Sequence, residues 1–309
     1  MTDINSTPLT TARALSGQTA RARASNYDLN RLTYAETFDS AWKRTCIKTI
    51  ETLTAKPRIL RLVKEFERRG PGKGQAFWQQ MLDVMGIACE TPPDQLAHIP
   101  EKGATIVVAN HPHGLVDGLV MAQLIGQRRQ DYRILTRSIL TGIDEEASKH
   151  MIAVPFPHEP DAQRKMIAMR TAAMDHLSQG GILALFPSGV VASSDTLFGP
   201  AIERDWNIFT AKMIRKSCTA VVPISFAGSN SRAYQIANRL SPTLRQGLLL
   251  YEILHALNAP QAPVIGPLIN QDEIDKRITD PRAFVAWLRA HVLALSDPKP
   301  LSSHMGEPT

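Results

Sequence analysis

From residue 104 to residue 296 the sequence alternates between two kinds of segment. Short runs rich in β-branched residues are followed by longer stretches with the apolar spacing of amphipathic helices. Strands that alternate with helices of this length indicate βαβ units around a parallel sheet. We therefore predict an α/β fold with a mainly parallel central sheet flanked by helices. The expected strands are 105–109, 132–135, 182–186, 220–226 and 263–265, and the expected helices are 117–128, 161–179, 206–216, 231–240 and 280–296.

An N-terminal helical extension precedes this region. Residues 35–55 and 57–69 read as two helices separated at Pro57, which suits the first turn of the second helix, and a third helix is expected at about 74–85. In the second helix one stripe of apolar residues faces away from the basic ones. This stripe can pack on the protein core or lie in a bilayer interface. Its members are Ile59, Leu62, Val63 and Phe66.

The net charge of +6 is concentrated in one region. Residues 43–73 hold ten basic and three acidic side chains, a local net charge of +7. Such a surface suits anionic partners, either an acidic carrier protein or anionic lipid headgroups at a membrane surface. Aromatic residues make up 6% of the chain and do not interleave with the basic run, which argues against nucleic acid. A solvated helical face remains the alternative interpretation.

The chain divides by composition into four parts. We expect a flexible N-terminus at 1–25, a basic helical region at 26–90, an α/β domain at 91–296 and a flexible tail at 297–309. The three cysteines lie far apart and form no C-x-x-C pair, which fits a reducing cytoplasm. Neither a signal peptide nor a membrane-spanning run is expected, so any contact with a membrane is peripheral.

Ligands of parallel sheets bind beyond the carboxyl ends of the strands. Polar residues follow the expected strands at four such points, where we expect the chemistry. These are Asn110-His111, Thr136-Arg137, Pro187-Ser188-Gly189 and Ala227-Gly228.

The segment after the first strand carries the clearest catalytic pattern. It reads Asn-His-Pro-His-Gly-Leu-Val-Asp over residues 110–117. Pro112 and Gly114 turn the chain, so that Asp117 can come back to His111. A carboxylate bonded to one imidazole nitrogen raises the basicity of the other, which can then take a proton from a hydroxyl. The alternative is a helix N-cap aspartate beside an incidental histidine.

Two later segments also end strands in turns. Phe186-Pro187-Ser188-Gly189 closes one, and Val222-Pro223 lies inside another. Proline removes a donor from the ladder, so we expect the second strand to be bulged or to lie at an edge.

In this order, the three segments resemble the motifs of the glycerolipid (lysophospholipid, PlsC-type) acyltransferase family, over roughly residues 76–228. The family's Asn-His…Asp, Phe-Pro-Glu-Gly and Val-Pro motifs are matched by Asn110, His111 and Asp117, by Phe186, Pro187, Ser188 and Gly189, and by Val222-Pro223. Five residues separate His111 from Asp117 where the family has four. This HPxGxxDG form is similar to a hemolysin-like branch related to ornithine-lipid (aminolipid) O-acyltransferases.

The resemblance implies an O-acyltransferase that moves a fatty acyl chain from acyl-ACP (acyl carrier protein) or acyl-CoA to a lysolipid hydroxyl. It implies His111 as general base, Asp117 as its partner and no cofactor, metal or covalent intermediate. Ser188 stands where the family has Glu, which favours a lyso-aminolipid over the alternative acceptor, 1-acylglycerol-3-phosphate. The expected location is cytoplasmic, on the inner face of the cytoplasmic membrane. The residues expected to bind substrate are Asn110, His113, Gly114, Arg137, Phe186, Pro187, Ser188, Gly189 and Pro223.

Three other functions agree with parts of the sequence. His111-x-His113 with Asp117 could begin a zinc site of a metal-dependent hydrolase, but the other histidines form no H-x-x-x-H pair. A serine hydrolase would need G-x-S-x-G, which the sequence lacks. A basic binding module leaves the His111–Asp117 arrangement unexplained.

Overall fold

The structure is a computed structural model that describes residues 33–35, 38–138, 141 and 144–296. The segments expected to be flexible, 1–25 and 297–309, lie outside the described residues. Twelve helices and eight strands follow one another in the described part of the chain. The helices are α1 (Ala41–Thr54), α2 (Lys56–Arg69), α3 (Gln75–Met85), α4 (Pro93–Leu96), α5 (Leu115–Arg128), α6 (Glu145–Ser148), α7 (Ala162–Ser178), α8 (Ile208–Ser217), α9 (Arg232–Leu240), α10 (Pro242–His255), α11 (Gln271–Asp275) and α12 (Pro281–Ala294). The strands are β1 (Thr105–Ala109), β2 (Tyr132–Arg137), β3 (Met151–Val154), β4 (Ile182–Leu185), β5 (Ser193–Ser194), β6 (Ala201–Ile202), β7 (Ala220–Ser225) and β8 (Val264–Ile265).

Six strands form one sheet in the order β3-β2-β4-β1-β7-β8. All neighbouring pairs are parallel except β7 and β8, which are antiparallel. Strands β5 and β6 form a separate antiparallel ribbon. The predicted α/β fold with a mainly parallel sheet is confirmed.

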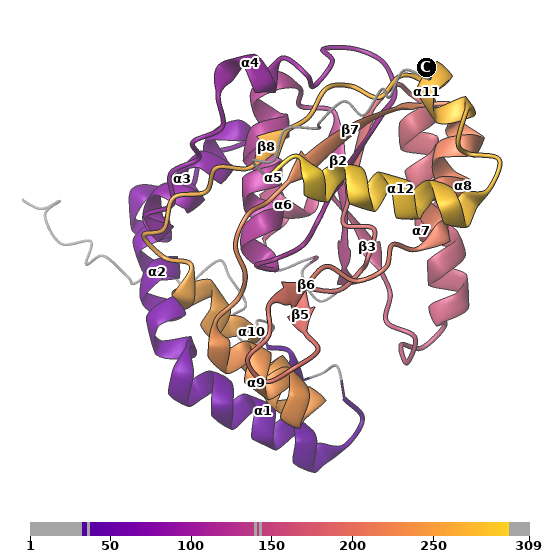
Figure 1. Cartoon of the computed structure of the whole chain (residues 1–309). Helices are drawn as coiled ribbons and strands as arrows, with labels where there is room; N and C mark the ends of the chain where they lie inside the picture. Colours follow the sequence, from indigo (N-terminus) through magenta and orange to yellow (C-terminus); the bar gives the residue numbers. More distant parts are fainter. Residues whose placement is uncertain (1–32, 36–37, 139–140, 142–143, 297–309) are drawn as a thin grey trace, which may run out of the picture.

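Helices cover both faces of the sheet (Figure 1). Successive residues of β1 point to opposite sides, because side chains alternate along a strand. Val107 and Ala109 join one buried cluster with residues of α2, α3, α5 and α10, whereas Ile106 and Val108 join another with residues of α7, α8 and α12. The buried strands therefore read as continuous apolar runs, as strands covered on both faces do.

Helices α2 and α3 of the N-terminal region belong to the first of these layers. In α2, Ile59 and Phe66 are buried in the core cluster, and Leu62 and Val63 pack against it. The apolar stripe of α2 therefore faces the protein rather than a bilayer. Pro57 lies in the first turn of α2, as predicted, and α1 begins at Ala41, later than the predicted residue 35. Among the described helices, none is both long and apolar enough to span a membrane.

The position of Pro223 corrects one prediction. Its strand, β7, is not an edge strand, since it lies between β1 and β8 and pairs with β1 without interruption. The irregularity is on the other side, where Val221 pairs with Ile269 and Ile224 with Ile265, so that one extra residue of the partner segment lies opposite Pro223. The missing N–H of Pro223 faces this side, and the partner chain bulges beside it.

Candidate active site

The carboxyl ends of three central strands meet at one edge of the sheet. Val108 of β1 lies beside Leu185 of β4, and Ala109 lies beside Ile224 of β7. The segments that follow these strands therefore begin side by side. This edge is where parallel sheets bind ligands, and three of the expected sites start here.

Asn110 fastens the ends of β1 and β7 together. Its amide Nδ2 donates to the carbonyl oxygen of Phe226 at 2.8 Å, and the Phe226 N–H donates to Oδ1 of Asn110 at 2.7 Å. The side chain is buried and both of its ends are used within the protein. Asn110 thus fixes the start of the turn over residues 110–117. Because both ends of its side chain are bonded within the protein, this geometry does not support its predicted contact with substrate.

The turn after Asn110 brings His111 and Asp117 together. Gly114, at a φ of +80°, reverses the chain and precedes the first residue of α5. Asp117 then lies in the first helical turn, and His111 donates from Nδ1 to its Oδ2 at 2.9 Å. Glycine reaches this φ without a steric penalty, which explains the residue at position 114.

The carboxylate of Asp117 is fully buried and accepts hydrogen bonds on both oxygens. Besides His111, Oδ2 accepts the main-chain N–H groups of His113 and Gly114, at 2.8 and 3.1 Å, and Oδ1 accepts Nδ1 of His113 at 3.0 Å. Burial alone would raise the pKa of Asp117, but the bonds from His111 and His113 outweigh it and hold the pKa below its usual range. Asp117 is therefore ionised and can only accept.

The protonation of His111 follows from this. Because an ionised carboxylate donates nothing, Nδ1 of His111 carries the proton that it shares with Asp117. In the neutral imidazole the lone pair is then on Nε2, which has no hydrogen-bond partner among the described residues. The ring also stacks on Phe186, with the ring centroids 3.9 Å apart. The arrangement presents a fixed base with its free nitrogen available for a proton.

The side chain of His113 is more deeply buried than that of His111. Its ring reaches across to the loop after β7, where a Cβ added to Gly228 would lie 2.8 Å from Nε2. Its side chain is 11% exposed, against 17% for His111. The two imidazoles share one carboxylate, and His111 is the more accessible of the pair.

The Phe186–Gly189 turn forms the next wall of the site. The Gly189 N–H donates to the Phe186 carbonyl at 2.9 Å, and Ser188 donates from Oγ to the Val190 carbonyl at 2.9 Å. Pro187 is buried, and its carbonyl accepts the Asn207 N–H at 3.0 Å. The hydroxyl of Ser188 thus serves the turn itself.

Arg137 approaches this turn from the end of β2. It donates from Nη2 to the Gly189 carbonyl at 3.1 Å, and its guanidinium lies over the Phe156 ring. Burial lowers the pKa of Arg137, so an anionic group would find a partly desolvated cation here.

Pro223 differs from the other residues predicted to bind substrate. It is buried inside β7 beside Val108, and it lies within the sheet and not at the edge where the other residues meet.

Glu203 was not predicted from the sequence. Its carboxylate, on the segment between β6 and α8, accepts the main-chain N–H of His111 at 3.0 Å. The surrounding residues, Glu203-Arg204-Asp205-Trp206, show no motif or periodicity, so only the folded chain reveals the contact.

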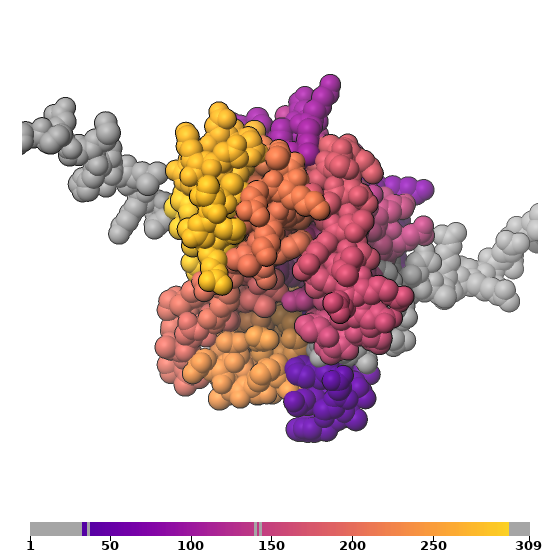
Figure 2. All heavy atoms as spheres, turned by 90° about the vertical axis from the view of Figure 1, so that its right-hand side faces the viewer, coloured from indigo at the N-terminus to yellow at the C-terminus, as the bar shows by residue number. Residues whose placement is uncertain are grey.

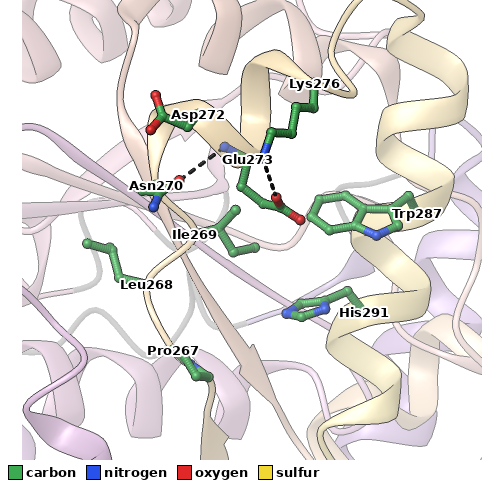
Figure 3. Close-up of a pocket in the computed structure, with 9 residues that line it drawn as sticks. All are labelled: Pro267, Leu268, Ile269, Asn270, Asp272, Glu273, Lys276, Trp287 and His291. Carbon is green, nitrogen blue, oxygen red and sulfur yellow. Dashed lines mark hydrogen bonds and ion pairs between the residues drawn. The ribbon is translucent and has the colours of Figure 1, made fainter. Parts of the chain in front are cut away.

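Two other observations concern places where a metal ion or a ligand could bind. Within the described residues no group of three His, Cys, Asp or Glu side chains is arranged to hold a metal ion. A hollow of about 380 Å³ opens between Ile269 and α12, where Trp287 and His291 line it (Figure 3). Ile269 pairs with Val221 near the start of β7, so this hollow is at the opposite end of the sheet from His111.

Comparison with known proteins assigns the class of enzyme. Residues 94–227 match the protein-family model described as Acyltransferase. Among solved structures the chain is similar to the 1-acyl-sn-glycerophosphate (LPA) acyltransferase PlsC from Thermotoga maritima, with 15% sequence identity and a TM-score of 0.43 over 85% of this chain and 95% of that chain. The curated proteins contain no sequence match. The family match covers His111, Asp117 and the Phe186–Gly189 turn, and the chain is an acyltransferase.

Proposed function

We propose that this acyltransferase moves a fatty acyl chain from an acyl thioester to the hydroxyl of a lysolipid, with His111 as general base. The observation that carries the proposal is the hydrogen bond from His111 to the buried Asp117, at the sheet edge where the acyltransferase motifs meet. Asp117 fixes the ring and stabilises the positive charge that the ring acquires.

The reaction needs no covalent enzyme intermediate. Nε2 of His111 takes the proton of the acceptor hydroxyl while the hydroxyl oxygen attacks the thioester carbonyl carbon. The adduct then expels the thiolate, which recovers the proton from His111. One C–O bond forms, one C–S bond breaks, and His111 returns to its neutral form. The Arg137 guanidinium, beside the Phe186–Gly189 turn, is the cation available to stabilise negative charge on the adduct.

The acceptor that we favour is a lyso-aminolipid of the ornithine-lipid type. Ser188 replaces the glutamate of the family motif, and its hydroxyl is bonded to Val190 within the turn. A turn without this carboxylate suits an acceptor other than 1-acylglycerol-3-phosphate. An assay of the purified enzyme with both acceptors, using acyl-ACP and acyl-CoA as donors, separates the possibilities. Preferential acylation of 1-acylglycerol-3-phosphate would contradict our choice of acceptor but not the mechanism.

The catalytic roles are tested by two substitutions. His111→Ala and Asp117→Asn should each lower kcat/KM by at least about 10³-fold, because the first removes the base and the second its negatively charged partner. Circular dichroism and thermal unfolding should show that both variants remain folded. A folded His111→Ala enzyme with near-normal turnover would overturn the mechanism.

We further propose that the enzyme works on the inner face of the cytoplasmic membrane. Exposed basic residues of α1 and α2, among them Lys43, Arg58 and Arg61, suit anionic headgroups or an acidic acyl carrier protein. An apolar groove of about 320 Å³ lies nearby, between α1, α9 and α10, and Leu240 and Leu244 at its rim are 67% and 40% exposed. Figure 2 shows α1 in indigo beside the orange α9–α10 segment at the lower end of the molecule. Basic charge next to exposed apolar side chains is the composition of an interfacial surface.

A further inference from the structure

Two residues on either side of the β5–β6 ribbon, Ala192 and Glu203, bond to the main chain of His111. The Ala192 N–H, just before β5, donates to the His111 carbonyl at 2.8 Å. The His111 N–H donates in turn to Oε2 of Glu203, just after β6, at 3.0 Å. The two anchors flank the β5–β6 ribbon. The backbone of the base is thus fixed by residues far from it in the sequence.

The Glu203 carboxylate is unusual in its surroundings. Glu203 is 6% exposed, and its second oxygen, Oε1, accepts Nε1 of the buried Trp206 at 3.0 Å. Arg289 of α12 donates to the main-chain carbonyl of Glu203 and not to the carboxylate. Within the described part of the chain, no lysine or arginine lies within 4.0 Å of the carboxylate oxygens. Burial of a charge with only neutral donors is costly, and such groups gather at functional sites.

We propose that Glu203 is a positioning residue of the active site, and that its negative charge favours the protonated form of His111 during the reaction. The proposal rests on the proposed function, since it takes His111 as the base. The main-chain bond sets where the imidazole lies. The bonded N–H belongs to the same residue as the ring, and Glu203 is 6% exposed, so its charge acts on a ring that becomes positive more strongly than it would in solvent.

Several other charged or titratable groups lie on the turn of His111 and on the elements next to it, and they enter the same balance. Asp117 and His113 belong to its own turn. Arg137 comes from β2, and Arg204 binds Ser193 and Asp195 of the ribbon side. Among the described residues, the carboxylates that bond to His111 are Asp117, at the ring, and Glu203, at the main-chain N–H. Removal of either should therefore make His111 harder to protonate.

The test must separate charge from fold. Gln in place of Glu203 would turn its NH₂ group toward one of two N–H donors, so Trp206→Phe is introduced first to remove one of them. The pair to compare is Trp206→Phe and Trp206→Phe/Glu203→Gln. The second variant keeps a carbonyl oxygen for the His111 N–H and lacks only the charge.

Glu252 provides a matched control. It is 2% exposed, and its carboxylate accepts two neutral donors, the N–H and the hydroxyl of Ser231, both at 2.7 Å. It has no contact with His111. Glu252→Gln therefore removes a similarly buried charge away from the base.

The measurement is kcat/KM against pH, with the His111 titration followed by NMR of labelled imidazole. We expect Trp206→Phe/Glu203→Gln to lower kcat/KM about tenfold relative to Trp206→Phe. The midpoint of the acid limb and the His111 titration should both move to lower pH by at least about half a unit. Glu252→Gln should leave both midpoints in place.

Two outcomes would overturn the proposal. One is a folded double variant with the rate and midpoints of Trp206→Phe. The other is an equal midpoint shift in Glu252→Gln, which would show a general effect of buried charge. Failure of the proposed function is separate, because it would appear as activity in His111→Ala whatever the Glu203 variants do.

Discussion

The Asp117 carboxylate receives four donors, two from imidazole rings and two from the main chain of its own turn. Three of them bind Oδ2 and one binds Oδ1, so the carboxylate is held in one orientation before substrate arrives. Preorganised charge of this kind costs no reorganisation during the reaction. His113 contributes by holding the oxygen that His111 does not use.

The contribution of His113 is testable with His113→Phe. Phenylalanine keeps a ring against Gly228 but removes the bond to Oδ1 of Asp117. We expect kcat/KM to fall about 10- to 150-fold, as the loss of one hydrogen bond to a charged group, about 1.5–3 kcal/mol, implies. Steady-state kinetics beside His111→Ala checks this. A loss in His113→Phe as large as that in His111→Ala would instead identify His113 as the base.

At the scale of elements, the long parallel strands and the helices with one apolar face follow from the sequence. Strand β1 is found at its predicted bounds, Thr105–Ala109, and helices α7, α8 and α12 differ from prediction by one or two residues at each end. Their apolar periodicity is strong, and Gly180 or Pro281 marks their limits.

Other elements gave no such signal. Helix α10 was missed because its apolar residues face two ways, with Leu250 and Leu254 in the core and Leu244 and Leu248 in the groove, so that no single stripe appears. Strand β3 has four residues and lies at the sheet edge, and β5 and β6 have two each. Strands this short carry too few residues to show an alternating pattern, and they are defined by their pairing in the folded chain.

The residues of the candidate site also differ in how well the sequence predicts them. His111, Asp117 and the Phe186–Gly189 turn were predicted, because each follows a recognisable strand and belongs to a motif. Glu203 was not, since a single carboxylate that reaches a main-chain N–H from 92 residues away leaves no local pattern. Asn110 was predicted to bind substrate, whereas it joins two strands.

A buried histidine packed against Tyr132 of β2 makes the stability of the fold sensitive to pH. His150 stacks on Tyr132 with ring centroids 4.4 Å apart, and its buried Nδ1 has no hydrogen-bond partner within the part of the chain that the structure describes. Burial lowers the pKa of His150, so the unfolded chain binds a proton more readily than the folded one. The stability that neutral His150 contributes is thus present above about pH 6.5 and is lost as the pH falls toward the lowered value.

His150→Phe should remove this dependence. We expect the free energy of unfolding of the wild type to fall relative to that of the variant between pH 7.5 and pH 5.5, because only the wild type must bury an imidazole that tends to charge. Urea unfolding of both proteins at each pH gives the difference. A difference that stays constant across this range would contradict the assignment.

At the scale of the whole molecule, the apolar groove between α1, α9 and α10 is the surface that we propose to meet the membrane. The β5–β6 ribbon links this layer to the active site, since the Ser194 N–H donates to Oε1 of Gln235 in α9 at 2.7 Å, and Ala192 is bonded to His111. His111 and the layer that holds the groove are therefore connected through the β5–β6 ribbon, which lies beside α9 and α10 in Figure 1.

Membrane binding is tested by Leu240→Ser/Leu244→Ser. Burial of a leucine side chain stabilises by about 1.5–3 kcal/mol, so the double variant should bind vesicles of anionic phospholipid at least about tenfold more weakly. Sedimentation with vesicles measures this, and added salt should weaken binding of both proteins through the basic residues.

The control is Ile167→Ser/Leu268→Ser, which removes two apolar side chains of similar exposure, 58% and 40%, outside the groove. Its binding should equal that of the wild type. Equal losses in the two double variants would show that the groove is not the binding surface.

The two anchors of His111 also restrict where the chain can change in length. An insertion between Phe186 and Ala192, or one beside Glu203, would move an atom that holds the base. The tip of the ribbon, residues 195–200, is different, because the pairing of Ser194 with Ala201 closes its base. Extra residues there leave Ala192 and Glu203 in place, and loops closed in this way accept insertions. Related sequences should therefore differ in length at the tip and keep their spacing on either side of it.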